Sequence, residues 1–346
     1  MMTSAPFDKD TNLMAKALVE AIPEQGRYLE SLTGKSLISS SQLNRDGILQ
    51  LLRLAARCEL DNRKFSCHLN NKILISAFFE SSTRTRLSFE SAWLRLGGST
   101  VSITDKGTTR IGVGESLRDV AEMVSNYGDC VVLRDSSEDS VKIMSNNLSI
   151  PIINAGNGID EHPTQSLIDL YALLKWNPSI LSGKSRKLSI GLIGAPVRMR
   201  AARSLLILMS CFPEFFSEVF VLCDEEEQEP FRQAQLSMLQ EKGLKISLTD
   251  KIGDILPRLD VVYMNAISLK TAGHRDFGSG YFIDNNSPLK KQAIVLHPLP
   301  RMGELDSNLD DTPHNWYFIQ AKGGVYVRMA LAMAICGCPS EIVDIT

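Results

Sequence analysis

The chain alternates short apolar segments with segments of helical periodicity, and this alternation restricts its fold more than any other feature. Residues 73–79 form an apolar, β-favouring run that predicts a buried strand. Residues 86–96 have helical periodicity, and Gly97 and Gly98 are expected to end that helix. Strands that alternate with helices indicate an α/β fold with mostly parallel sheets. Ligands of such sheets bind beyond the carboxyl ends of the strands, so we expect the functional residues at strand-to-helix junctions.

The alternation continues in two series, which are separated by the polar segment 177–186. In the first series we predict a short amphipathic helix at 11–22 that Pro23 ends, strands at 99–104, 130–134 and 151–155, and helices at 115–127, 137–147 and 164–176, the last of which is long and amphipathic. In the second series we predict strands at 187–194, 219–223, 261–265 and 293–297, and helices at 199–211, 230–242 and 324–335.

Two such series predict two doubly wound domains, each a mostly parallel sheet flanked by helices, joined by long helices. The length of 346 residues agrees with about two domains. The expected parts are an N-terminal extension at 1–36, a first domain at 37–178 that is completed by the C-terminal helix 323–346, and a second domain at 179–322.

The composition argues against several classes of protein. The 37 Lys and Arg residues against 40 Asp and Glu residues give a net charge of −3, so no basic excess favours nucleic acid. No apolar run approaches the ~18–20 residues that span a bilayer, and the acidic N-terminal segment fits neither a secretory signal nor a transit peptide. The seven cysteines are too scattered for a disulfide framework, and the pair Cys336 and Cys338 is interpreted as buried apolar side chains. We expect a soluble cytoplasmic protein with no metal, no other cofactor, no nucleic acid and no membrane partner.

The junction after the first predicted strand is the strongest local signal, with the sequence Ser-Thr-Arg-Thr-Arg at 82–86. Ser82 stands where it caps the following helix, and the hydroxyls of Thr83 and Thr85 lie beside the guanidinium of Arg84. Amides at a helix start, hydroxyl donors and a forked cation together bind phosphate. A capped surface helix with solvated arginines is the alternative, and this pattern by itself favours neither.

A second junction carries His-Pro-Thr-Gln at 162–165. Pro163 suits the first helical turn, so His162 and Gln165 are expected to project from a helix start. An imidazole donor and a side-chain amide suit a polarised carbonyl and its NH2 group, whereas an ordinary helix cap is the alternative for His162.

A third junction carries His-Pro-Leu-Pro-Arg at 297–301. The two prolines around Leu299 restrict the backbone, and an X-Pro bond there can be cis. A rigid bend of this kind turns carbonyl oxygens outward, where they accept hydrogen bonds from an amine.

Together these three motifs resemble the signatures of the aspartate/ornithine carbamoyltransferase family. The Phe-Phe-Glu sequence at 78–80 and the His-Pro sequence at 297–298 are closer to the aspartate branch than to the ornithine branch. The segment 312–318 and Gln320 are also similar to bacterial aspartate carbamoyltransferase catalytic chains. The resemblance extends from about Leu37 to Cys336, which is nearly the whole chain.

The resemblance implies that the first domain binds carbamoyl phosphate and the second an amino acid, with the site at the cleft and at a subunit boundary of a homotrimer. The residues implied to bind carbamoyl phosphate are Ser82, Thr83, Arg84, Thr85, Arg134, His162, Gln165 and the main-chain carbonyls of Pro298 and Leu299. Those implied in catalysis are Arg84, Thr85, Arg134 and His162, and those implied to contact the acceptor are Arg200, with Glu80 as its orienting partner, Ala266, Ser268 and Leu299. The acceptor amine attacks the carbonyl and expels phosphate through a tetrahedral intermediate, and no cofactor is implied.

The sequence departs from the family pattern at the loop lysine and at the acceptor side chain. Val113 stands where the aspartate branch has a lysine, and Lys106 or Arg110 of the same loop either replaces it or is a solvated loop charge. Ala266 and Ser268 stand where the family has an arginine and a glutamine that bind the acceptor's side-chain carboxylate. Losing such a charge-assisted contact removes about 2–5 kcal/mol of acceptor recognition.

These departures leave the acceptor open. Aspartate is the acceptor of the family branch, which makes N-carbamoyl-L-aspartate for pyrimidine biosynthesis, but Lys270, His274 and Arg275 are candidates to bind a different side chain. The main alternative function is a catalytically impaired family member that acts as an assembly or regulatory subunit, and a regulatory chain as a partner also stays open. A dinucleotide-binding turn at 190–195 is disfavoured because the segment lacks the G-x-G-x-x-G spacing.

Overall fold

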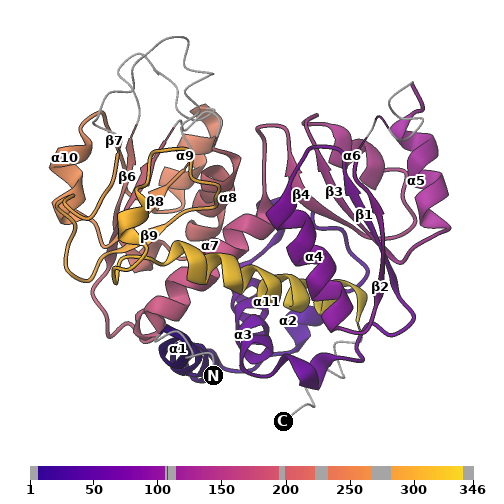
Figure 1. Ribbon diagram of the computed structural model, residues 1–346, viewed down its shortest axis with the longest axis horizontal. Helices are drawn as coiled ribbons and strands as arrows, with labels where there is room; N and C mark the ends of the chain where they lie inside the picture. Colours follow the sequence, from indigo (N-terminus) through magenta and orange to yellow (C-terminus); the bar gives the residue numbers. More distant parts are fainter. Residues whose placement is uncertain are drawn as a thin grey trace. The chain divides into compact units, whose positions relative to one another are not determined.

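The computed structural model describes residues 7–105, 107, 114–194, 199–222, 233–265 and 282–337. The chain divides into two compact units (Figure 1): unit 1 comprises Met1–Pro178 and Lys322–Thr346, and unit 2 comprises Ser179–Ala321. Both contain a parallel sheet flanked by helices, which confirms the predicted fold class. Within the described ranges, no helix combines the length and the apolar character that a membrane span requires.

Unit 1 is built on a four-stranded parallel sheet with the strand order β2-β1-β3-β4. Its strands are β1 (Ile73–Phe78), β2 (Ser99–Ile103), β3 (Cys130–Asp135) and β4 (Ile152–Asn157). Its helices are α1 (Phe7–Ala21), α2 (Arg27–Glu30), α3 (Arg45–Leu60), α4 (Thr83–Arg95), α5 (Leu117–Ser125), α6 (Ser140–Ser145) and α7 (Pro163–Trp176), with short 3-10 helices at Ser40–Gln42 and Asn62–Phe65. The core between the sheet and α5 and α6 is aliphatic.

Unit 2 is built on a five-stranded parallel sheet with the strand order β7-β6-β5-β8-β9. Its strands are β5 (Leu188–Ile193), β6 (Phe216–Leu222), β7 (Ile246–Thr249), β8 (Val261–Met264) and β9 (Ile294–Leu296). Its helices are α8 (Arg200–Met209), α9 (Gln233–Glu241) and α10 (Ile252–Ile255), with 3-10 helices at Pro213–Phe215, Leu256–Arg258 and Ser307–Leu309. The 3-10 helix Pro178–Ser182 and the long helix α11 (Tyr317–Cys336) contain the two points at which the chain passes between the units.

Most predicted segments correspond to observed elements, but several boundaries differ. The helix predicted at 86–96 starts at Thr83, and Gly97, with φ +88°, follows its end as expected. Four of the described α-helices and strands, α2, α3, β7 and α10, have no counterpart in the prediction. For α3 a signal was present, because the Asn44 side chain accepts the Gly47 N–H at 2.8 Å and caps a strongly periodic segment. The strand β7 is short and only partly buried, so its alternation is weak.

The last helix begins at Tyr317, seven residues before the predicted start, because two glycines lie inside it rather than at its boundary. A Cβ atom at Gly323 would lie 3.0 Å from the Tyr171 ring, and one at Gly324 would lie 3.2 Å from Ile168. Both neighbours belong to α7, so the glycines allow close packing of α11 on α7 despite the cost of about 1 kcal/mol for glycine inside a helix.

Helix α7 was predicted to be amphipathic, yet the structure buries every residue from Pro163 to Lys175. Helices α1 and α3 pack on it in addition to the sheet, so the face that the sequence pattern marks as polar is covered as well. Polar groups on this helix therefore require partners inside the protein.

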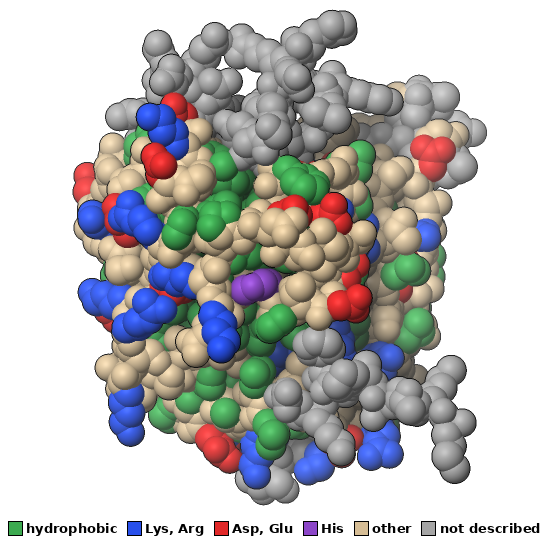
Figure 2. All heavy atoms as spheres, turned by 60° about the vertical axis from the view of Figure 1, so that its left-hand side comes forward, with side chains coloured by type: hydrophobic (Ala, Val, Ile, Leu, Met, Phe, Trp, Pro, Cys, Tyr) green, Lys and Arg blue, Asp and Glu red, His purple; other side chains and the backbone are tan. Residues whose placement is uncertain are grey.

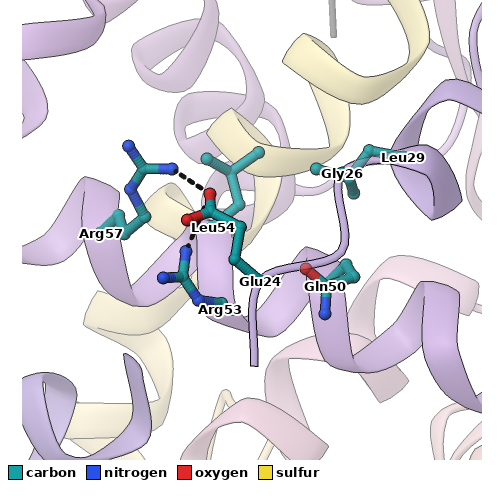
Figure 3. A pocket seen from close by; sticks show the side chains of 7 residues that line it. All are labelled: Glu24, Gly26, Leu29, Gln50, Arg53, Leu54 and Arg57. Carbon is teal, nitrogen blue, oxygen red and sulfur yellow. Dashed lines mark hydrogen bonds and ion pairs between the residues drawn. The ribbon is translucent and has the colours of Figure 1, made fainter. Parts of the chain in front are cut away.

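The chain between α1 and α2 is fastened to α3 by polar side chains (Figure 3). Glu24 forms ion pairs with Arg53 at 3.1 Å and with Arg57 at 3.0 Å. Gln50 accepts the Gln25 N–H at 3.0 Å and donates to the Pro23 carbonyl at 2.8 Å. These contacts fix the end of α1, whose side chains Ala15 and Leu18, together with the following Ile22, are buried in unit 1.

Charged side chains of both signs are interspersed on the face shown in Figure 2, and hydrophobic side chains lie between them in small groups. Among the described residues of this face, the mixed charges create no extended region of positive or negative electrostatic potential.

A buried ion pair connects α3 to α7. Lys175 Nζ lies 3.0 and 2.9 Å from the two carboxylate oxygens of Glu59, and both side chains are 1% exposed. The Tyr171 hydroxyl donates to the same carboxylate. Burial lowers the pKa of Lys175, and Glu59 opposes this by stabilising its charge. The pair is therefore interdependent: neither charge is tolerated in this position without the other.

We expect Lys175→Met to lower the free energy of unfolding by about 3–5 kcal/mol, because it leaves the Glu59 carboxylate buried without a cation. The double variant with Glu59→Gln should recover most of this loss. Urea denaturation of the two variants measures the difference, with Lys184→Met as the control for removing an exposed lysine. Equal stability of the single and double variants would contradict the interdependence.

A second buried carboxylate, Asp260, holds the start of β5 beside β8. Asp260 accepts hydrogen bonds from the Ser189 N–H at 3.0 Å and from Lys290 Nζ at 2.8 Å, and it also pairs with Arg186. Burial disfavours its charge, but the donors Lys290 and Ser189 outweigh burial and lower the pKa of Asp260. The ionised form therefore stabilises unit 2.

Because the pKa of Asp260 is lower in the folded chain than in the unfolded chain, its contribution is complete above the unfolded pKa of about 4. The contribution is lost as the pH falls through the folded pKa. We expect Asp260→Asn to destabilise the protein by about 2 kcal/mol at pH 7 and by progressively less below about pH 4. Denaturation midpoints across this pH range test the prediction against Asp254→Asn, which changes an exposed carboxylate. A loss independent of pH would contradict it.

Candidate functional site

Parallel strands place the predicted residues of unit 1 at one edge of its sheet. Phe78, the last residue of β1, pairs with Arg134 of β3, and β4 lies next to β3. The chain leaves β1 into α4 and leaves β4 toward α7, so the starts of both helices follow the carboxyl ends of the two strands that flank β3 (Figure 1). The edge that sequence reasoning selected thus brings together the motifs at 82–86 and 162–165 with Arg134.

At the start of α4, Ser82 occupies the N-cap position with extended backbone angles, φ −158° and ψ 96°. Its side chain makes no capping hydrogen bond, so the expectation that the Ser82 hydroxyl caps the helix is wrong. The Ser82 side chain therefore does not occupy the main-chain N–H groups of the first helical turn, which can donate to another acceptor. Thr83 and Arg84 are exposed, whereas Thr85 is buried. Although Arg84 is exposed overall, neighbouring protein atoms cover part of its side chain and lower its pKa, so a nearby anion would stabilise the charged form.

Arg134 is held between the ends of β1 and β4. Its Nη2 atom lies 2.6 Å from Glu80 Oε1, and its Nη1 atom donates to the Ala155 carbonyl at 3.5 Å. The main chain adds to this arrangement, because the Phe79 N–H donates to the Arg134 carbonyl at 2.8 Å. The register between β3 and β4 shifts between Leu133 and Asp135, so a bulge adjoins the arginine. Bulges next to functional sites commonly redirect a side chain.

Glu80 forms an ion pair with Arg134 in the structure and thereby holds one arginine of this sheet edge in place. Its implied role as the orienting partner of Arg200 stays a prediction.

At the start of α7, His162 is the N-cap residue and Pro163 occupies the first turn, as predicted. The His162 imidazole makes no capping bond, and its Nδ1 atom lies 3.5 Å from the Thr164 hydroxyl. Gln165 is buried, and its Nε2 atom donates to Asp169 Oδ1 at 2.7 Å. This bond fixes which way the amide of Gln165 faces and leaves its oxygen as the acceptor.

Arg328 of α11 is a residue of this region that sequence reasoning missed. Its neighbours in the sequence, Tyr326, Met329 and Met333, are typical of core packing. Arg328 is 4% exposed, and its Nη1 atom donates to the Ser88 hydroxyl on α4. The signal that could have identified it is a single arginine in a long apolar segment, because charged side chains are rarely buried unless they pair with another group.

Arg328 also adds positive charge next to Arg134. Burial and the charge of Arg134 lower the pKa of Arg328 to about 9, while Asp169 raises it. The guanidinium therefore stays charged at neutral pH. Its Nε atom is buried without a hydrogen-bond partner. Arg84, Arg134 and Arg328 together make this part of unit 1 positive, which suits an anionic ligand.

The predicted residues Pro298, Leu299 and Arg200 belong to unit 2. The turn after β9 contains Pro298 and Leu299, both partly exposed, and its Leu299–Pro300 bond is cis. Arg200 is the first residue of α8. Ala266 and Ser268 lie outside the described residues, as do Val113, Lys106 and Arg110 of the predicted loop and Lys270, His274 and Arg275.

Carboxylate, imidazole and thiol groups do not gather into a possible metal site anywhere among the described residues. The chemistry that the observed groups of unit 1 supply is electrostatic: guanidinium groups, helix-start amides and an imidazole around one sheet edge. Such groups stabilise negative charge on a phosphate or on a carbonyl oxygen.

Comparison with protein families matches both halves of the chain. Residues 35–175 match the carbamoyl-P binding domain, and residues 186–335 the Asp/Orn binding domain, of aspartate/ornithine carbamoyltransferases.

Individual relatives agree with this match. The aspartate carbamoyltransferase catalytic subunit of Alkaliphilus oremlandii is 34% identical over 312 residues, covering 88% of this chain and 92% of the relative. That of Methanocella arvoryzae is 35% identical over 309 residues, covering 88% and 97%. The crystal structure of Trypanosoma cruzi aspartate transcarbamoylase in complex with carbamoyl phosphate and aspartate has a TM-score of 0.80 and 32% identity, covering 89% of this chain and 97% of that one.

We expect Arg328→Met to weaken the binding of inorganic phosphate about tenfold, which corresponds to about 1.4 kcal/mol. The variant removes a buried positive charge near Arg134 but keeps most of the side-chain volume, so the melting temperature should not fall. Calorimetric titration with phosphate and thermal unfolding measure the two effects. Arg95→Met, at the other end of α4, removes an equal but exposed charge and should leave the affinity within twofold. Equal affinities of the two variants would contradict the role of Arg328.

Proposed function

Because the chain belongs to the aspartate/ornithine carbamoyltransferase family, we propose that it transfers the carbamoyl group of carbamoyl phosphate to the amino group of aspartate or a related amino acid. The single observation that carries this proposal is the cationic edge of unit 1, where the open start of α4 follows the strand that pairs with Arg134. With aspartate as the acceptor, the product is N-carbamoyl-L-aspartate, and the reaction belongs to pyrimidine biosynthesis in the cytoplasm.

In this proposal unit 1 binds the phosphate end of the donor. Ser82, Thr83 and Thr85 donate hydroxyl and amide hydrogen bonds to the phosphate oxygens, and Arg84 pairs with them. Arg134 reaches both the phosphate and the carbonyl oxygen of the donor. The support is the arrangement around Arg134, since its ion pair with Glu80 at 2.6 Å holds the guanidinium before any ligand is present.

The carbonyl is activated by three groups, Thr85, Arg134 and His162. The acceptor's unprotonated amine attacks the carbonyl carbon, and negative charge develops on the carbonyl oxygen of the tetrahedral intermediate. Hydrogen-bond donors at this oxygen lower the barrier because their orientation is set in advance. The C–O bond to phosphate then breaks, phosphate leaves with the electron pair, and the nitrogen loses its proton.

The carbamoyl NH2 group needs acceptors rather than donors. Gln165 supplies one, because its Nε2 atom is committed to Asp169 and its oxygen is the atom left to accept. The carbonyl oxygens of Pro298 and Leu299 are the proposed further acceptors, and Arg200 is proposed to bind the α-carboxylate of the amino acid.

We further propose that the chain forms a homotrimer with shared active sites. Leu87 and Leu94 of α4 are 52% and 56% exposed and stand seven residues apart on one helix face. Val101 on the edge strand β2 is 53% exposed. Exposed apolar side chains on a helix and an edge strand are typical of a surface that a second copy covers.

The decisive experiment supplies carbamoyl phosphate with a panel of amino acids and follows phosphate release. We expect turnover with aspartate or with another amino acid of the panel, and we expect Arg84→Ala to weaken carbamoyl phosphate binding by about 100-fold because a charge-assisted contact is lost. Arg95→Met serves as the matched arginine control. Binding of carbamoyl phosphate without turnover on any acceptor would favour an assembly or regulatory subunit, and absence of binding would refute the proposal.

A further inference from the structure

The turn after β9 is braced from inside by two buried side chains, His297 and Glu304. His297 Nδ1 lies 2.7 Å from the Leu299 main-chain nitrogen, and its Nε2 atom lies 2.8 Å from Glu304 Oε1. The side chains of His297 and Glu304 are 0% and 3% exposed. The imidazole thus connects the turn that carries the proposed carbamoyl acceptors to a carboxylate seven residues further along the chain.

The hydrogen bonds determine where the proton of the imidazole lies. A main-chain N–H can only donate, so Nδ1 of His297 must accept from Leu299 and carries no proton. The ring proton then lies on Nε2 and is donated to Glu304. A carboxylate is the acceptor that enforces this arrangement, because when ionised it cannot donate back.

Glu304 is well suited to remain ionised. Both of its oxygens also accept the Met302 N–H, at 3.1 and 3.0 Å. Burial disfavours its charge, but the hydrogen bonds from His297 and Met302 outweigh burial and lower the pKa of Glu304. Its charge is therefore present throughout the neutral range.

These hydrogen bonds support an uncommon main-chain conformation at Leu299. Leu299 has φ +60°, in the left-handed region that costs a residue with a side chain roughly 1–2 kcal/mol. The hydrogen bond from its N–H to His297 joins the peptide between Pro298 and Leu299 to a buried side chain. Strain of this kind persists where the surroundings enforce it and is concentrated at functional positions.

We infer that Glu304 is a positioning residue of the carbamoyl transfer: it fixes the tautomer and orientation of His297, which holds Leu299 N–H and so orients the carbonyl oxygens of Pro298 and Leu299. This inference rests on the proposed function, because those two oxygens are the proposed acceptors of the carbamoyl NH2 group. Glu304 itself touches no substrate and acts through His297.

The test measures binding at the carbamoyl end and at the phosphate end of carbamoyl phosphate separately. Glu304→Gln keeps the side-chain size but places an NH2 group next to His297 Nε2 or Met302 N–H, both of which are donors. We expect the KM for carbamoyl phosphate to rise about tenfold, whereas the affinity for inorganic phosphate, proposed to bind at the start of α4, stays within twofold. A purely structural loss would weaken both ligands or neither, and either of those results would overturn the inference.

Asp260→Asn is the matched control, because Asp260 is a second carboxylate of unit 2 that is buried in a network of donors, at 3% exposed. It should lower stability without changing the ratio of the carbamoyl phosphate KM to the phosphate dissociation constant. An equal change of this ratio in both variants would mean that general loosening of unit 2 is responsible, and the inference would fail.

A second variant tests whether Glu304 acts through His297. In His297→Asn the amide oxygen can still accept the Leu299 N–H, as in an Asx turn, but no atom reaches Glu304. We expect this variant alone to raise the KM about as much as Glu304→Gln, and we expect the double variant to show no further change beyond twofold. A second tenfold rise in the double variant would show that Glu304 acts independently and would overturn the inference.

These results are distinguishable from failure of the proposed function itself. If the wild-type protein neither binds carbamoyl phosphate nor releases phosphate with any amino acid, the proposed function is refuted. If the wild-type protein turns over and Glu304→Gln keeps the ratio of the two affinities, only the role of Glu304 is refuted.

Discussion

The parallel pairing of β1 with β3 is the constraint on which the candidate site depends. It sets Phe78 opposite Arg134, so that the chain leaving β1 passes directly over the arginine, and the Phe79 N–H bonds to its carbonyl. Glu80 is thereby brought within 2.6 Å of the Arg134 guanidinium, and the start of α4 follows at once. A shift of this register by one residue would turn Arg134 to the opposite face of the sheet and separate the cations that make this edge positive.

Buried charges recur in both units, and their partners distinguish their roles. The pair of Lys175 with Glu59 is satisfied by its own members and by Tyr171, so it fixes how α3 and α7 pack. Arg328 differs, because its Nε atom lacks a partner and its charge reinforces that of Arg134. A buried cation placed among other cations costs stability, and a ligand anion offsets that cost. A buried charge with its own partner, such as Lys175, is therefore interpreted as part of the core, and a buried charge among like charges, such as Arg328, as part of the candidate site.

Much of the fold and part of the site could be predicted from particular residues. The apolar run at 73–79, the glycines at 97–98 and Pro163 each have a local physical consequence, and the structure places a strand, a helix end and a helix start there. Contacts between distant residues could not be predicted in this way. The sequence pattern suggested that Ser82 caps α4 and that α7 exposes a polar face, and both expectations fail because neighbouring elements decide what each side chain meets.

The sequence by itself determined the alternation of strands and helices, the cationic motif at the start of α4 and the family to which the motifs point, because these follow from local periodicity and from residue chemistry at short spacing. Only the tertiary structure decided that Glu80 pairs with Arg134, that Arg328 of α11 lies against Ser88 of α4, and that His297 is bonded to both Leu299 and Glu304. The reason is that the partner of a buried charge or of a strained turn is the donor or acceptor that lies next to it after the chain has packed, and such partners can lie far apart in the sequence.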